Sequence, residues 1–285
     1  MPTVTALAFG FSPCPNDTFA FFAAVHGLVG DAASRLQPFL ADIETLNRRA
    51  LDDADALPIT KLSIPALARV TDRYTVLAAG AALGFGCGPL VVARATASAA
   101  TLADLCGCTV AIPGRHTTAF LLFSLFAPPG VRFVEMRFDA IMAAVANGEC
   151  DAGLVIHESR FTYQDHGLRA LADLGELWEQ DGGGPLPLGV IAARRDLGVG
   201  RLGSIEATLR ASVLHARANP EASASYVAEH AQELAPAVRA RHIALYVNEF
   251  SVDLGAAGRT AVEALLARGR RCGALPVGRS PWSDG

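Results

Sequence analysis

Lysine is scarce in this chain of 285 residues, and its arginines gather along no single stretch. The formal net charge is -4, so the chain offers no basic field to nucleic acid or to an anionic membrane surface. No apolar run reaches the roughly 20 residues that a membrane-spanning helix needs. The N-terminus lacks the basic segment and the small-residue cleavage site of a secretory signal. Together these absences predict a cytoplasmic protein that binds neither nucleic acid nor a membrane.

Cysteine is present but scattered. Of the six cysteines, only Cys106 and Cys108 lie close together in sequence, and no second pair or histidine accompanies them. Structural zinc sites use four such ligands at recognisable spacings, so this pair is weak evidence for zinc. The pattern favours reduced thiols, and we expect no metal site.

The residues that are present describe a well-buried globular protein. Hydrophobic residues make up 51% of the chain and charged residues only 18%. Strand-like and helix-like segments alternate, which predicts an α/β fold, and the length suggests about two domains. Residues 88–94 and 186–194 share one pattern, a Gly/Pro segment that runs into an apolar strand ending in arginine. We therefore expect a discontinuous lobe of residues 1–88 and 191–285, and an inserted lobe of residues 89–190, joined by two hinge strands.

One arrangement occurs three times: an apolar strand, a short polar loop and the start of a helix. In the first unit, residues 6–24, two prolines end the strand, and we expect Asn16, Asp17 and Thr18 to supply the N-cap of the helix. The unpaired N–H groups at a helix start favour an anion, typically a carboxylate or a phosphate. The alternative is a helix cap that binds no ligand.

The second and third units repeat this arrangement. In the second, a strand is followed by Ser63 as the expected N-cap, and Thr60 and Lys61 are expected at the loop. In the third, strand 108–112 leads to a helix with Thr117 or Thr118 near its N-cap. The alternative is again structural: these residues only cap helices, and Lys61 is a solvated lysine that binds no ligand.

His157 ends the apolar strand that begins at Asp151. In open α/β sheets, ligands bind outside the carboxyl ends of the strands. With an unperturbed pKa of about 6.5, a neutral histidine in that position can accept a proton near pH 7. The alternative is a histidine that only satisfies the local structure.

Six motifs, at these separations, resemble the 1,4-dihydroxy-6-naphthoate synthases of the futalosine route to menaquinone. They are SPCPNDTF (12–19), TKLS (60–63), GCGPLVV (86–92), PGRHTTA (113–119), IHESRFTY (156–163) and HAQE (230–233). The resemblance covers nearly the whole chain, with no departure at the motif positions. SPCPND is also similar to the chorismate dehydratases of the same route.

This resemblance implies a fold like that of type 2 periplasmic binding proteins, with two α/β lobes around a central cleft. It implies a carbon–carbon lyase that converts cyclic dehypoxanthine futalosine, a small molecule with a carboxylate, to 1,4-dihydroxy-6-naphthoate and a sugar-derived fragment such as dihydroxyacetone, without a cofactor. His157 would accept the proton, and the implied substrate-binding residues are Lys61, Leu62, Ser63, Thr117 and Thr118. Asn16, Asp17 and Thr18 are of the right types to join them.

Some alternatives stay open. Glu158 or a backbone group could orient His157, and His116 is a competing base or only flanks the two threonines. Cys14, between two prolines, is a candidate nucleophile or a packing residue. The chain could also be a chorismate dehydratase or a non-catalytic protein that binds small anions. The oligomeric state is open.

Overall fold

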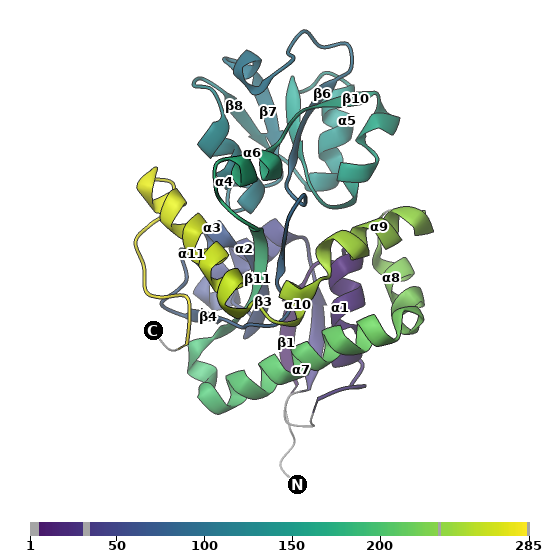
Figure 1. Ribbon diagram of the computed structural model, residues 1–285, viewed down its shortest axis with the longest axis vertical. Coiled ribbons are helices and arrows are strands. Elements are labelled where there is room, and N and C mark those ends of the chain that lie inside the picture. Colours follow the sequence, from purple (N-terminus) through teal and green to yellow (C-terminus); the bar gives the residue numbers. More distant parts are fainter. Residues whose placement is uncertain (1–5, 31–34, 233–234, 284–285) are drawn as a thin grey trace. The chain divides into compact units, whose positions relative to one another are not determined.

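The computed structural model describes residues 6–30, 35–232 and 235–283, which form two compact units (Figure 1). Unit 1 comprises Met1–Gly84 and Pro187–Gly285, and unit 2 comprises Phe85–Leu186. Each unit is built on its own β-sheet. Among the described residues, no helix has the length and the apolar character needed to cross a membrane.

The sheet of unit 1 has the strand order β2-β1-β3-β11-β4, and β5 pairs with β11. β1 is parallel to β2 and β3, whereas β11 runs antiparallel to β3 and β4. The strands are β1 (Leu7–Phe11), β2 (Leu36–Leu40), β3 (Ile59–Ser63), β4 (Tyr74–Val76), β5 (Ala82–Gly84) and β11 (Leu186–Arg194).

Helices pack on this sheet around a core that includes Phe9, Phe11 and Phe21, whose ring centroids lie 5.0 to 5.4 Å apart. The long helix α7 lies against α1, where the Ser212 hydroxyl donates to the Ala20 carbonyl at 2.7 Å (Figure 1). The helices are α1 (Pro15–Val25), α2 (Ile43–Leu51), α3 (Ile64–Leu67), α7 (Val199–Ala218), α8 (Ala224–His230), α9 (Pro236–Tyr246), α10 (Glu249–Val252) and α11 (Gly255–Arg271), with short 3-10 turns η2 (Asp53–Asp55), η7 (Arg195–Leu197) and η8 (Pro220–Ser223).

The sheet of unit 2 has the strand order β10-β6-β9-β7-β8. β7 is parallel to β8 and β9, and β6 is antiparallel to β9 and β10. Its strands are β6 (Leu90–Arg94), β7 (Thr109–Ile112), β8 (Arg132–Glu135), β9 (Ala152–Val155) and β10 (Leu168–Asp173). Its helices are α4 (Thr118–Phe126), α5 (Ile141–Ala146) and α6 (Leu174–Gln180), with 3-10 turns η3 (Leu102–Leu105), η4 (Phe138–Ala140), η5 (His157–Phe161) and η6 (Tyr163–His166).

The predicted α/β alternation is confirmed, and the expected strand 7–11 and strand 186–194 occur as β1 and β11. The N-cap expected at residues 16–18 is wrong, because α1 begins at Pro15. Proline has no N–H to leave unpaired and its fixed φ suits the first helical position, so the helix starts earlier than a polar cap would predict. Glu233, the last residue of the HAQE motif, lies outside the described residues.

A close backbone contact in unit 2 gives a test of the packing. A Cβ added to Gly88 would lie 2.2 Å from the amide nitrogen of Gly175, which cannot move without displacing α6. We expect Gly88→Ala to lower the free energy of unfolding by about 3 kcal/mol or more. The measurement is urea unfolding followed by Trp178 fluorescence in a Trp282→Phe background, because the chain has two tryptophans.

The comparison variant is Gly107→Ala in the same unit. No atom lies within 4 Å of a Cβ at Gly107, so only its left-handed backbone, with φ of 75°, opposes alanine. That cost is roughly 1 to 2 kcal/mol. Equal losses of stability in the two variants would contradict the tight contact at Gly88.

Candidate active site

Within each unit, the candidate residues lie at or directly after the carboxyl ends of parallel strands. In unit 1, Asn16–Thr18 come after β1, and Lys61–Ser63 are the last residues of the neighbouring strand β3. In unit 2, Thr117 and Thr118 come after β7, and His157 comes after the neighbouring strand β9. Because parallel neighbours end at the same edge of a sheet, each sheet gathers its candidates at one edge, where α/β proteins bind ligands.

At the start of α1, Cys14 occupies the N-cap position with an extended backbone and no side-chain cap. Asn16, Asp17 and Thr18 therefore lie in the first turn of the helix. The Thr18 hydroxyl donates to the Cys14 carbonyl at 3.1 Å. Asp17 brings a carboxylate to this helix start, and one of its oxygens accepts from the backbone N–H and the hydroxyl of Ser12 at 3.1 and 2.7 Å. The first turn of α1 therefore carries a negative charge of its own, which disfavours the binding of an external anion at this helix start.

The other oxygen of Asp17 forms an ion pair with Lys61 at 2.5 Å, and the two side chains are only 3% and 6% exposed. The expectation that Thr60 and Lys61 stand in a loop is wrong, because both residues lie within the central strand β3. Lys61 is the only lysine of the chain. An ammonium has three donors, and within the described part of the chain the Asp17 carboxylate is its one hydrogen-bond acceptor. Two donors of a buried cation are left for a ligand or for water.

The Asp17–Lys61 pair belongs to a larger buried polar network. The Asn16 amide donates to Asp17 at 2.7 Å, and its oxygen accepts from Nε2 of His242, which is fully buried in α9, at 2.8 Å. In a separate buried contact, Ser63 donates its backbone N–H to the Asn47 side chain at 2.9 Å. The network and this contact hold the edge residues of unit 1 in fixed orientations, since buried polar groups need their partners.

In unit 2, Thr117 is the N-cap of α4, as the sequence predicted. Its hydroxyl oxygen accepts from the Phe120 N–H at 3.2 Å, and the hydroxyl donates to the Gly114 carbonyl at 2.7 Å. Thr117 and Thr118 are both buried. The first turn of α4 contains no acidic residue, in contrast to the first turn of α1 with Asp17. Its N-terminal partial positive charge is therefore not offset by a carboxylate on the helix itself.

His157 stands two residues after β9, at the start of η5. Its φ of 57° is the only left-handed value of a non-glycine residue in the part of the chain that the structure describes. Such a backbone costs roughly 1 to 2 kcal/mol, and strained residues of this kind concentrate at functional sites. The His157 ring meets the Phe138 ring edge to face, with centroids 5.1 Å apart.

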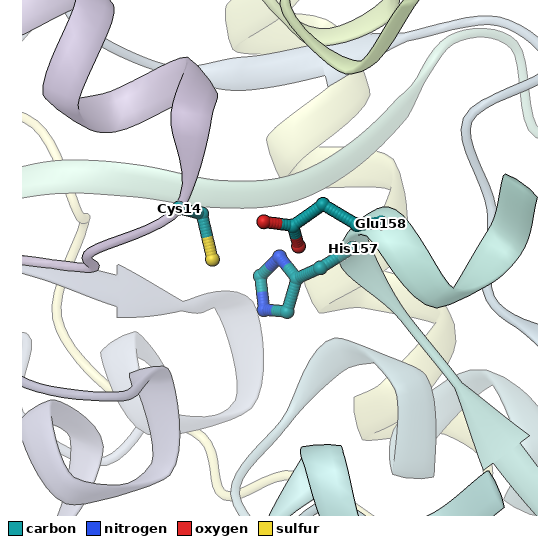
Figure 2. A group of neighbouring side chains, drawn as sticks. All are labelled: Cys14, His157 and Glu158. Carbon is teal, nitrogen blue, oxygen red and sulfur yellow. The ribbon is translucent and has the colours of Figure 1, made fainter. Parts of the chain in front are cut away.

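Glu158 follows His157 in the same turn and is buried. Figure 2 shows its carboxylate beside the imidazole, and a ring nitrogen and a carboxylate oxygen lie within 4.8 Å of each other. The carboxylate is thus close enough to influence the ring, and its role as the orienting group stays a prediction.

The competing candidates, Cys14 and His116, lie at the starts of α1 and α4. Cys14, labelled in Figure 2, is a buried residue at the start of α1, and His116 directly precedes Thr117. Burial raises the pKa of the Cys87 thiol to about 12, so that thiol is protonated at neutral pH. Sequence reasoning did not connect His242 with Asn16, because the contact joins residues far apart in the chain.

Comparison with known proteins identifies the family of this chain. A family model described as menaquinone biosynthesis matches residues 7–271. The chain belongs to the menaquinone biosynthesis family. Two relatives are named 1,4-dihydroxy-6-naphthoate synthase. The one from Thermus thermophilus is 53% identical over 92% of this chain and 93% of its own length. The one from Streptomyces coelicolor is 50% identical over 95% of each.

Solved structures show the fold. A protein from Archaeoglobus fulgidus is 35% identical with a TM-score of 0.87, covering 95% of this chain and 98% of its own. The alkanesulfonate-binding protein SsuA from Xanthomonas axonopodis is 17% identical with a TM-score of 0.71, covering 95% and 94%. A Candida albicans protein with the generic periplasmic binding protein fold is 12% identical with a TM-score of 0.67, covering 97% and 93%. The family member described here therefore has a periplasmic-binding-protein-like fold, as predicted.

Proposed function

We propose that this protein is a 1,4-dihydroxy-6-naphthoate synthase that acts as a carbon–carbon lyase. It would convert cyclic dehypoxanthine futalosine to 1,4-dihydroxy-6-naphthoate and a sugar-derived fragment such as dihydroxyacetone. The observation that carries the proposal is the 53% and 50% identity to two relatives of that name over more than nine-tenths of this chain. A cytoplasmic location stays a prediction from the sequence.

In the proposed reaction His157 is the general base. Release of the fragment requires the cleavage of a carbon–carbon bond next to a ketone, and the electron pair of that bond passes toward the ketone oxygen. A base must accept a proton from the substrate, and the ring then aromatises. The position of His157 after β9 and its left-handed backbone support this role.

We assign the substrate carboxylate to the start of α4. The first turn of α4 has no carboxylate of its own, and the Thr117 and Thr118 hydroxyls lie there. The start of α1 is a weaker anion site because Asp17 is in its first turn.

The edge residues of unit 1 would bind the polar ring and the departing fragment. Lys61 has two ammonium donors to offer, and Asn16, Thr18 and Ser63 carry groups that bind hydroxyls. The Leu62 side chain is buried in the core, so its contribution to binding would come from its main chain.

The carboxylate assignment predicts the effect of Thr117→Val. This variant keeps the shape of the side chain but loses the hydroxyl that caps α4. We expect KM for the cyclic substrate to rise about 10-fold, with kcat changing less, because without the cap the N–H groups at the start of α4 lose the orientation in which they would donate to the charged carboxylate. Thr117→Ser keeps the hydroxyl and should keep the wild-type KM. An unchanged KM in Thr117→Val would remove the carboxylate from this place.

The proposed function is tested by a side-by-side turnover assay. Purified protein is incubated separately with cyclic dehypoxanthine futalosine and with chorismate, and consumption of each is followed by chromatography. We expect only the cyclic compound to be consumed. Consumption of chorismate alone, or binding of the cyclic compound without turnover, would overturn the proposal.

A further inference from the structure

The turn that carries His157 is fastened by an arginine three residues later. Arg160 belongs to η5, and its side chain is only 15% exposed. Its Nη1 donates to the Gly88 carbonyl at 2.5 Å, and its Nη2 forms an ion pair with the Asp173 carboxylate. All of these residues belong to unit 2. The guanidinium thus joins η5 to two segments that are distant from it in sequence.

Both anchors are themselves fixed. Asp173 uses one oxygen to hold Arg160 and the other to cap α6, where it accepts from the Gly175 N–H at 2.8 Å. Gly88 packs directly on Gly175, with no room for a Cβ between them. The Leu174 N–H donates to the Pro89 carbonyl at 2.9 Å, which closes the contact between α6 and the entry to β6. Arg160 is therefore attached to a rigid part of unit 2.

His157 needs such support because its backbone is strained. A residue with φ of 57° relaxes toward a right-handed conformation unless its surroundings hold it. Relaxation would rotate the Cα–Cβ bond and re-aim the imidazole. The next two residues, Glu158 and Ser159, are buried, and Arg160 follows them in the same short turn.

We propose that Arg160 is a positioning residue, which holds the His157 turn in its left-handed conformation and so aims the imidazole at the substrate. It acts through the backbone of η5, with Gly88 and Asp173 as its anchors. The inference rests on the proposed function of His157 as the general base.

The kinetic test is Arg160→Lys. Lysine keeps the positive charge, but a single ammonium cannot reproduce the fork that reaches both the Gly88 carbonyl and the Asp173 carboxylate. We expect kcat to fall roughly 10- to 100-fold with KM within twofold, because small displacements of a catalytic group have effects of that size. Asp173→Asn keeps an oxygen for the α6 cap while weakening the hold on Arg160, and should lower kcat in the same direction.

Arg169→Lys is the matched control. Arg169 is another partly buried arginine of unit 2, and its guanidinium donates to the Ala97 and Ala99 carbonyls and not to the η5 anchors. We expect its kcat to stay within twofold of wild type. If both lysine variants lose the same fraction of activity, or if Arg160→Lys and Asp173→Asn keep wild-type kcat, Arg160 does not position the base.

A second readout is independent of turnover. The measurement is NMR of the histidine ring resonances. The chain has seven histidines, and the resonance of His157 is identified by its absence from the spectrum of His157→Asn. We expect Arg160→Lys to shift this signal and Arg169→Lys to leave it in place. An unshifted His157 signal in folded Arg160→Lys and Asp173→Asn overturns the inference. If the wild-type protein fails to turn over the cyclic substrate, the proposed function is wrong, and the ring signal still decides whether Arg160 positions His157.

Discussion

His157→Asn is expected to lower kcat for the cyclic substrate by about 100- to 10,000-fold, which is the usual contribution of a general base. Asparagine is the appropriate replacement because it tolerates a left-handed backbone better than most residues, and φ at this position is 57°. The turn should therefore keep its conformation while the proton acceptor is lost. The measurement is kcat and KM from initial rates, with KM expected to change less than tenfold.

His166→Asn is the control for this variant. His166 lies in η6 of the same unit and is exposed to solvent. Its loss should leave both kinetic constants at the wild-type values. If His157→Asn retains wild-type kcat, His157 is not the base, and His116 becomes the next candidate.

Lys61→Met is expected to destabilise the protein strongly. The change leaves the Asp17 carboxylate without the cation that now contacts it, in a place where the two side chains are 3% and 6% exposed. Removing one partner of a buried ion pair typically costs about 3 to 5 kcal/mol. Asp17→Asn, which leaves the ammonium uncompensated, should have a comparable effect. Urea unfolding measures both, and Glu249→Gln, in the exposed pair with Arg217, should cause no measurable change.

The double variant Asp17→Asn with Lys61→Met separates folding from binding. Without either charge, much of the lost stability should return. The ammonium donors remain absent, so KM should still be raised about 10-fold or more. A stable double variant with wild-type KM would show that Lys61 does not bind the substrate.

The same lysine can be observed directly. Lys61 is the only lysine, so protein made with lysine labelled with ¹⁵N at Nζ gives a single side-chain signal in an NMR spectrum. Addition of 1,4-dihydroxy-6-naphthoate should shift that signal. A signal that stays in place at a saturating concentration of bound product would contradict the assignment of Lys61 to the site.

Local pattern predicted much of this fold. The apolar run at 7–11 and the helical spacing at 43–51 correspond to β1 and α2, and the hydroxyl expected before α4 is the Thr117 cap. These features depend on neighbours along the chain, which a single sequence displays. The local pattern places the beginning of α1 too late in the sequence, because Pro15 starts a helix as well as a polar cap does.

The rest depends on contacts between distant residues. A lysine without a visible partner is expected in a solvated loop, and the partner of Lys61, Asp17, is 44 positions away in the sequence. In the same way, His242 is 226 positions from its partner Asn16. Arg160 belongs to the IHESRFTY motif (156–163), yet its anchors, Gly88 and Asp173, lie 72 and 13 positions from it. No spacing rule connects such residues, so the buried networks became visible only in the folded chain. The roles of the candidate site residues remain proposals.

The most direct test of the account is identification of the products that the wild-type protein forms from cyclic dehypoxanthine futalosine. Mass spectrometry of the reaction should find 1,4-dihydroxy-6-naphthoate and the sugar-derived fragment in equal amounts, without any added cofactor. Formation of a different aromatic product, or recovery of the substrate unchanged after incubation with folded protein, would contradict the account.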